Sequence, residues 1–104
     1  MKNIEIEIRI NDFRHYGVCY INFHNYECII NALGVSVEHQ NYGIGTFLIK
    51  RAEEFIRDNL KQNTVILYVE KGTWQAEWYK RLGYQISGIQ DGGEEYIRME
   101  KNLK

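Results

Sequence analysis

The feature that most constrains the fold is a glycine-containing turn between an apolar run and an amphipathic helix. Residues 32–37 form a β-like run, and Gly43 and Gly45 lie in the short stretch that follows it. Glycine permits backbone conformations that other residues avoid and lets a ligand approach closely. The first N–H groups of the following helix have no partner within it, and the helix dipole places partial positive charge there. The sequence therefore predicts a phosphate-binding cradle at this turn.

The helix after the turn is the clearest periodic element of the chain. Apolar residues recur at three- and four-residue steps from Ile44 to Leu60, and charged residues, including Glu53, are assigned to the opposite, solvent-facing side. Residues 64–69 follow as a continuous apolar run, which is expected of a central strand covered on both faces. A strand–helix–strand unit of this kind is a right-handed crossover between parallel strands.

Three antiparallel strands are predicted before the turn. Residues 4–10 alternate strictly between isoleucine and charged side chains, as in a half-buried strand. Residues 16–23 are rich in β-branched and aromatic side chains, and residues 24–26 resemble the tip of a hairpin that leads into residues 27–37. Gly34 interrupts this last strand and indicates a bulge.

The second half of the chain predicts a short helix and two further strands. The helix covers residues 73–82, with Gly72 or Thr73 at its start and Gly83 at its end. Strands are expected at residues 84–89 and 96–99, separated by an Asp-Gly-Gly turn. The fold class is therefore α+β, with a mixed, mostly antiparallel twisted sheet and one crossover, in a single domain over residues 1–104.

Composition excludes several classes of partner. The net charge of −1 gives no general attraction to nucleic acid or to anionic membranes, and no apolar run approaches the length of a membrane span. The N-terminus lacks the apolar region of a signal peptide, so the protein is expected in the cytoplasm. Cys19 and Cys28 are expected to be reduced and partly buried on neighbouring strands, and their spacing predicts no metal site.

Two motifs together resemble the GNAT family of N-acetyltransferases. The pattern Gln-x-x-Gly-x-Gly at residues 40–45 is similar to the family's acetyl-CoA pyrophosphate loop. The pattern Ala-x-x-Tyr-x-x-x-Gly-Tyr at residues 76–84 is similar to a second block of the family, and residues 99–103 resemble its last strand. The blocks occur in the family's order, and the resemblance extends over residues 16–103.

The resemblance implies that acetyl-CoA is the cofactor and that the turn binds its pyrophosphate. The backbone of Val35 and Val37 would pair with the pantetheine arm, in a gap between their strand and residues 64–69. The groups implied at the pyrophosphate are the Gln40 side chain and the backbone amides of Tyr42, Gly43, Ile44, Gly45 and Thr46.

The resemblance also implies catalytic roles. Tyr79 matches the tyrosine that protonates the leaving thiolate, which its ordinary pKa near ~10 allows at neutral pH. The alternative is that its ring only packs in the core. Lys80 or Arg81 would contact the 3′-phosphate. Glu27 is the first candidate for the general base, and three further candidates are His24, His39 and Glu70.

The chain departs from the family at its start, where the first strand and two helices that cover the acceptor site have no counterpart. An open acceptor face suits an amine acceptor of unknown size, or a site completed by a second subunit. The exposed edge of residues 4–10 also favours pairing with another copy, as in a homodimer. The expected function is acetyl transfer from acetyl-CoA to a primary amine by direct attack. Two alternatives are a non-catalytic CoA-binding or protein-interaction module and a small α+β domain without a cofactor.

Overall fold

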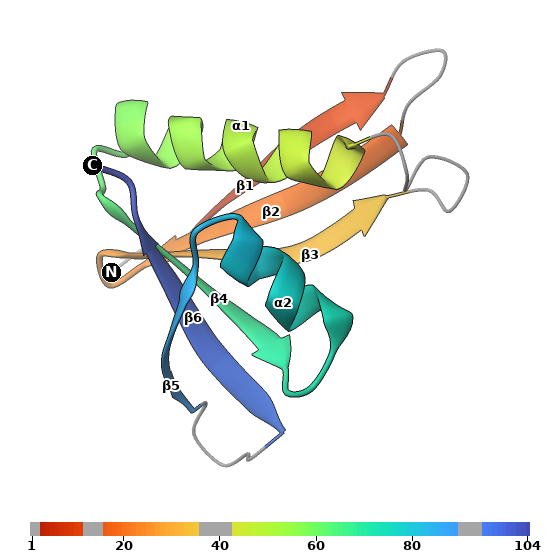
Figure 1. Ribbon diagram of the computed structural model, residues 1–104. Coiled ribbons are helices and arrows are strands. Elements are labelled where there is room, and N and C mark those ends of the chain that lie inside the picture. Colours follow the sequence, from red (N-terminus) through yellow and green to blue (C-terminus); the bar gives the residue numbers. More distant parts are fainter. Residues whose placement is uncertain (1–2, 12–15, 36–42, 90–94) are drawn as a thin grey trace.

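The computed structural model describes residues 3–11, 16–35, 43–89 and 95–104 (Figure 1). Within these ranges the strands form one mixed sheet in the order β1-β2-β3-β4-β6-β5. None of the helices in the described ranges combines the length and apolar character needed to cross a membrane. The elements in chain order are β1 Ile4–Asn11, β2 Tyr16–His24, β3 Glu27–Val35, α1 Ile44–Asp58, β4 Thr64–Glu70, α2 Trp74–Arg81, β5 Gln85–Ile89 and β6 Tyr96–Asn102.

The three strands before the turn form the antiparallel meander that the sequence predicts. β1 pairs with β2 along its whole length, and β2 pairs with β3 through a tight turn at Asn25 and Tyr26. Both turn residues have positive φ, 51° and 63°, which matches the twist of hairpin strands. The register shifts opposite the stretch before Gly34, because Val18 pairs with Gly34 whereas Tyr20 pairs with Asn31. The predicted bulge is therefore confirmed.

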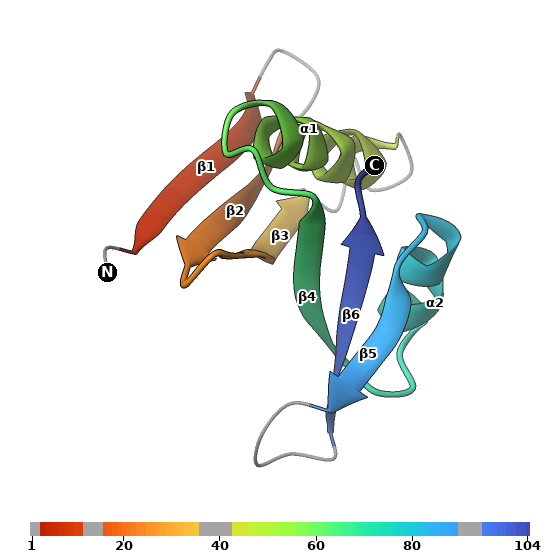
Figure 2. The ribbon, with the colours of Figure 1, turned by 90° about the vertical axis from the view of Figure 1, so that its left-hand side faces the viewer.

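The crossover through α1 makes β3 and β4 parallel, with Ile29 opposite Ile66. Beyond this position the two strands diverge towards their C-terminal ends, with α2 lying beside the widening space (Figure 1). On the other side, β4 pairs with β6 over its full length. Figure 2 shows β4, β6 and β5 turned away from β1, β2 and β3. The sheet is thus two groups of strands that meet where β3 passes β4.

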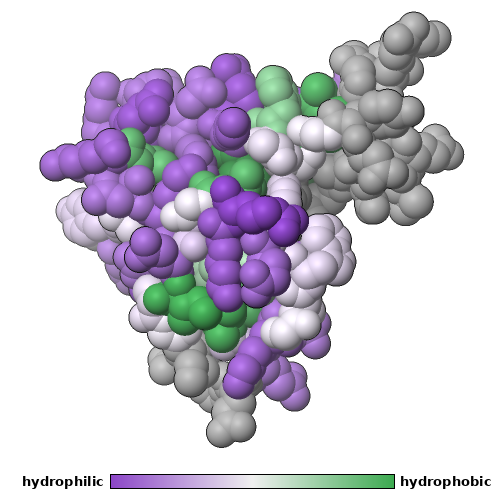
Figure 3. Space-filling view, viewed as in Figure 1, coloured by the Kyte–Doolittle hydropathy of each residue, from purple (hydrophilic) through white to green (hydrophobic). Residues whose placement is uncertain are grey.

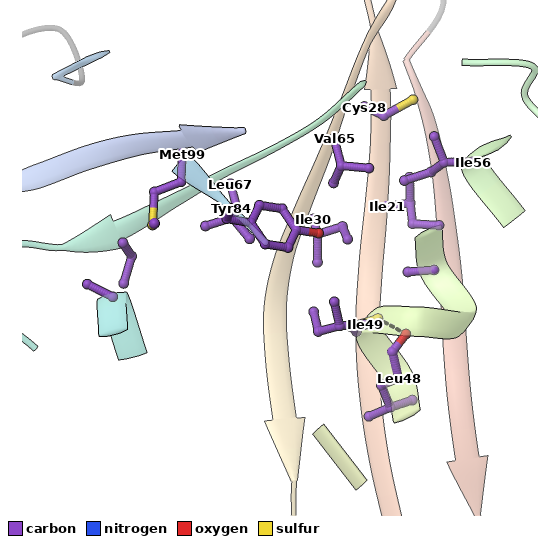
Figure 4. Packing of buried hydrophobic residues seen from close by; sticks show 14 of the residues in the cluster. Ile21, Cys28, Ile30, Leu48, Ile49, Ile56, Val65, Leu67, Tyr84 and Met99 are labelled. Atoms are coloured by element: carbon purple, nitrogen blue, oxygen red, sulfur yellow. Dashed lines mark hydrogen bonds between the residues drawn. The ribbon is translucent and has the colours of Figure 1, made fainter. Parts of the chain in front are cut away.

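Both helices contribute to one hydrophobic core. α1 packs over β1, β2 and β3, whereas α2 packs against β4. The Tyr84 ring, which follows α2, lies beside Ile30 and Leu67, so that it joins the two groups of strands (Figure 4). The outward face of α1 is hydrophilic along most of its length (Figure 3). Cys19 and Cys28 are fully buried in this core as free thiols, more deeply than expected.

Glu53 corrects the assignment of α1's charged residues to solvent. It is 8% exposed and accepts a hydrogen bond of 2.7 Å from the Tyr84 hydroxyl. Its other carboxylate oxygen lies 3.0 Å from Lys101 Nζ on β6. The carboxylate is satisfied by two partners, which is the condition for burying it. This cluster of Glu53, Tyr84 and Lys101 ties α1 to the C-terminal strands.

Candidate functional site

A cavity of about 290 Å³ lies between the diverging strands, beside the start of α2. Hydrogen-bonding between parallel strands ends where they separate, so backbone groups near the cavity are available to a ligand. The lining combines apolar side chains from the core with hydroxyl, amide and carboxylate groups. The lining residues are Ile30 and Asn31 on β3, Leu67, Tyr68, Val69 and Glu70 on β4, and Thr73, Gln75 and Tyr79 at α2.

Tyr79 is held at this cavity by Trp78 on α2 and by Tyr84, which lies between α2 and β5. Its ring centroid lies 4.9 Å from that of Trp78 and 5.7 Å from that of Tyr84, the latter in an edge-on arrangement. Its carbonyl accepts the Tyr84 N–H at 3.0 Å, and the Gly83 N–H donates to Lys80 O at 3.0 Å. Those two bonds form a Schellman motif with Gly83 at φ 102°, which confirms the predicted helix end.

The surroundings of Tyr79 change its acidity. Burial, with a smaller effect from Cys19, raises the pKa of Tyr79 to about 12. The hydroxyl therefore keeps its proton throughout the neutral range. This corrects the expectation of an ordinary tyrosine pKa: Tyr79 is a weaker acid than an exposed tyrosine, so it gives its proton to a thiolate less readily than the sequence predicted. The ring of Tyr79 packs in the core and also lines the cavity, so a role as proton donor stays a prediction.

The start of α1 has the features of an anion-binding helix terminus. Gly43 is its N-cap residue with φ 73°, and its carbonyl accepts the Phe47 N–H at 3.0 Å. The first turn of this helix, which lies within the described residues, contains no acidic side chain. The N–H groups of Ile44, Gly45 and Thr46 precede the first intrahelical bond and have no partner within the helix. Val37, Gln40 and Tyr42 lie outside the described residues, whereas Val35 ends β3.

The two basic residues after Tyr79 are exposed on α2. Lys80 Nζ lies 3.2 Å from a Glu77 carboxylate oxygen, one turn earlier on the same helix. Such an exposed pair contributes little to stability, so a stronger anion could compete for Lys80. Arg81 lies in the last turn of the helix.

The candidate bases occupy different places. Glu27 is exposed at the start of β3, and its carboxylate lies 3.3 Å from Arg98 Nη2 on β6. Arg98 also contacts the Glu100 carboxylate and donates to Ser87 Oγ at 2.9 Å. Glu70, by contrast, lines the cavity with Tyr79. His24 is exposed at the end of β2, and His39 lies outside the described residues.

Sequence reasoning did not single out the polar groups that accompany Tyr79 at the cavity. Asn31 and Gln75 carry no motif, and only the pairing of β3 with β4 and the position of α2 bring them there. Thr73 is the N-cap residue of α2, as one of the two predicted choices, but its hydroxyl donates to Glu70 O at 2.7 Å and accepts no hydrogen bond from the first amides of the helix. This bond links the start of α2 to the end of β4.

Comparison with known proteins gives a consistent set of relatives. A model of the acetyltransferase (GNAT) domain matches residues 7–86. The S-(2-succino)cysteine N-acetyltransferase of Bacillus subtilis is 46% identical over 66 residues, a match that covers 60% of this chain and 40% of that protein. This chain therefore spans about two fifths of the length of that curated relative.

Solved structures share the fold at low sequence identity. A Klebsiella pneumoniae protein described as an acyl-CoA N-acyltransferase has a TM-score of 0.82 at 20% identity, over 96% of this chain and 73% of that chain. A Vibrio cholerae spermidine/spermine N-acetyltransferase has a TM-score of 0.78 at 20% identity, over 95% and 65%. The PaiA N-acetyltransferase of Thermoplasma acidophilum in complex with coenzyme A has a TM-score of 0.71 at 20% identity, over 83% and 52%.

Proposed function

Because this chain belongs to the acetyltransferase (GNAT) domain family, we propose that it transfers an acetyl group from acetyl-CoA to a primary amine by direct attack in a ternary complex. The observation that carries the proposal is the Tyr79 side chain at a cavity between two parallel strands that separate. A thioester placed in that cavity would lie near a proton donor, Tyr79, and near a carboxylate, Glu70, because both residues line the cavity.

The residues present fit coenzyme A as the acyl carrier. The N-terminal amides of α1, at residues 44–46, would bind the pyrophosphate, with Gln40, Tyr42 and Gly43 contributing from the turn. The end of β3 at Val35, with Val37 beyond it, would offer backbone groups to the pantetheine amides. Lys80 or Arg81 would contact the 3′-phosphate. When bound, acetyl-CoA supplies the thioester whose acyl group is transferred.

The protein's own residues would move two protons in the reaction. The amine nitrogen forms a bond to the carbonyl carbon as the carbon–sulfur bond breaks. Glu27 or Glu70 takes a proton from the attacking amine, directly or through water, and Tyr79 donates its proton to the departing sulfur. A backbone N–H of β3 polarises the carbonyl, which is usually among the larger contributions in acyl transfer.

The position of the two carboxylates favours Glu70 as the base. Glu70 lies in the cavity wall, whereas Glu27 is already paired with Arg98. Replacing each by glutamine keeps its size and removes its ability to take a proton. We expect Glu70→Gln to lower kcat strongly and Glu27→Gln to lower it weakly. The reverse order would assign the base to Glu27.

The acceptor class is inferred from the relatives. The relative of highest sequence identity named above acts on S-(2-succino)cysteine, and one structural neighbour acts on spermidine and spermine. We therefore propose a small amine, either an amino-acid derivative or a polyamine, as the first acceptors to examine. Peptides with a free amine form the third group.

The test measures thiol release from acetyl-CoA in the presence of these three groups of amines. Turnover with at least one amine is expected, together with binding of coenzyme A measured by calorimetry. Binding without turnover for any acceptor would refute the enzyme and leave the CoA-binding module. Absence of binding would refute both, because the cofactor site is common to them.

A further inference from the structure

β1 forms a long regular edge of the sheet in the part of the chain that the structure describes. All of its residues, Ile4–Asn11, pair with β2 without a register shift. The edge at the other end of the sheet is β5, Gln85–Ile89, which is shorter and is interrupted by a shift between Ile86 and Gly88. A bulge or a short strand discourages pairing, whereas a long regular edge exposes a row of backbone donors and acceptors. β1 is therefore the edge suited to accept another strand.

The side chains of β1 divide by face. Ile6, Ile8 and Ile10 are half-buried against the core, whereas Glu7 and Arg9 are exposed on the opposite face. These two charged residues already contact each other, with Arg9 Nη2 2.8 Å from Glu7 Oε1. The strand therefore has an apolar row on one side and a charged row of both signs on the other.

A groove of about 400 Å³ continues the apolar row between β1 and α1. Its apolar lining is Ile8, Phe47 and Phe55, and Phe47 is 50% exposed. Glu7 and Arg9 at the edge of β1 and Arg51, Glu54 and Asp58 of α1 also line it, so that charges of both signs surround the apolar residues. A large exposed aromatic beside an unpaired strand indicates an interaction surface.

We propose that β1 pairs antiparallel with β1 of a second copy of this chain, about a two-fold axis at Ile8. Opposite residues of an antiparallel pair share a face, so the two-fold axis must pass midway between one residue and its own copy in the partner. An axis at Glu7 would place the two Glu7 side chains opposite each other, and an axis at Ile6 would place Glu5 opposite the partner's Glu7.

The axis at Ile8 satisfies both faces of the strand. It places Glu7 opposite the partner's Arg9 and Arg9 opposite the partner's Glu7, giving two pairs of opposite charge. On the other face it places Ile6 opposite the partner's Ile10 and Ile8 opposite its own copy. Both α1 helices then lie on the same face of a continuous sheet, with their two grooves facing each other. The surface is thus complementary to itself, as a two-fold interface requires.

Sedimentation equilibrium of the full chain, from micromolar to millimolar concentration, is the first test. We expect a reversible dimer. Arg9→Glu places two acidic residues opposite each other twice, so it should raise the dissociation constant by about tenfold. The double variant Glu7→Arg/Arg9→Glu restores opposite charges and should return the constant to that of the unmodified protein. Lys71→Glu, an equal charge change at an exposed turn away from β1, should leave it unaltered.

Disulfide formation between copies tests the register directly. In Ile8→Cys the two introduced thiols lie opposite each other, within the separation of about 4.4–6.8 Å that a disulfide requires between Cα atoms. In Ile6→Cys the two thiols are offset by four residues, about 13 Å along the strand, which is too far. Oxidation should therefore link Ile8→Cys and not Ile6→Cys. A mixture of Ile6→Cys with Ile10→Cys should also link.

Three results would overturn the proposal. The first is a protein that stays monomeric at every concentration, and the second is a dimer whose dissociation constant is unchanged by Arg9→Glu. The third is that Ile6→Cys cross-links as fast as Ile8→Cys. The native thiols do not confuse this experiment, because Cys19 and Cys28 are buried and burial raises the pKa of each to about 11. The dimer is independent of the proposed acetyl transfer, so either can fail alone.

Discussion

At the scale of single residues, Tyr79 is the side chain whose removal best separates chemistry from packing. Its ring belongs to an aromatic cluster with Trp78 and Tyr84, and its hydroxyl remains protonated because burial raises its pKa to about 12. Tyr79→Phe keeps the ring and deletes only the hydroxyl group, which carries the proton. We expect kcat to fall by about 100-fold, at the low end for general acid catalysis, because water can replace the donor in part. KM for acetyl-CoA should change little.

The matched control is Tyr20→Phe, which removes a hydroxyl bonded to Glu7 at 3.2 Å, on β2. It should leave both constants unaltered. If Tyr79→Phe weakened binding of coenzyme A as much as it slowed turnover, the hydroxyl would be structural.

The position of a residue could be predicted from the sequence where a motif contains it, and could not be predicted where a contact between distant parts of the chain determines it. Tyr79 stands within a recognisable pattern, and the structure places it at the cavity. Glu53 belongs to the charged series of its helix, so periodicity assigned it to solvent. It is buried because Tyr84 and Lys101, from distant parts of the chain, meet its carboxylate. The signal that could have found it is Tyr84 itself, since a buried tyrosine hydroxyl needs a partner.

At the scale of elements, the start of α1 depends on the conformation of one residue. Gly43 has φ 73°, which disfavours a side chain, and a Cβ there would meet no atom within 4 Å. Gly43→Ala should therefore destabilise the protein through its backbone alone, by about 1–2 kcal/mol. Gly43→Asn should cost less, because asparagine tolerates this region better. Urea unfolding measures both.

The same two variants report on the proposed phosphate contact. A difference in stability without a difference in affinity for coenzyme A would mean that the turn serves the helix only. Affinity that falls in parallel with stability would instead show that the amides need this geometry to bind.

Most elements were predictable because each has a local cause. Alternation defined β1, a turn defined the β2–β3 hairpin, and Gly83 defined the end of α2. The crossover predicted that β3 and β4 are parallel, and the resemblance to the family implied the gap between them, but the order of all six described strands was not predicted. The lining of the cavity could not be predicted, because Asn31 and Gln75 are brought together by the pairing of β3 with β4 and the packing of α2 against β4.

At the scale of the whole molecule, buried thiol and tyrosine hydroxyl groups make the stability of the fold depend on pH in the alkaline range. Burial raises the pKa of Cys19 and Cys28 from 9.0 to about 11, and burial also raises the pKa of Tyr84, with Glu53 adding to the effect. The folded state therefore holds these protons more tightly than the unfolded chain. The contribution of the two thiols to stability is complete below about pH 9 and is lost as pH rises through about 11, whereas that of Tyr84 begins to be lost only above its ordinary pKa of 10.0.

The measurement is the unfolding temperature by circular dichroism from about pH 7 to about pH 11. It should be nearly constant at first and then fall above about pH 9. In Cys28→Ala, which removes one of the buried thiols, the unfolding temperature should fall less steeply over the same pH range, whatever its value at pH 7. A constant unfolding temperature across the range would contradict the raised pKa values.

The meeting of β3 and β4 at Ile29 and Ile66 has a consequence for how the molecule moves. The two groups of strands share one paired position in the described residues, and the Glu53–Tyr84–Lys101 cluster links them across the boundary between β3 and β4. A ligand whose amides bind between β3 and β4 would replace the interstrand hydrogen bonds that are lost where the two strands diverge, and would hold the two groups of strands together. Amide protons of β3 and β4 beside the boundary should therefore exchange fast in the free protein, and their exchange should slow most when the ligand binds.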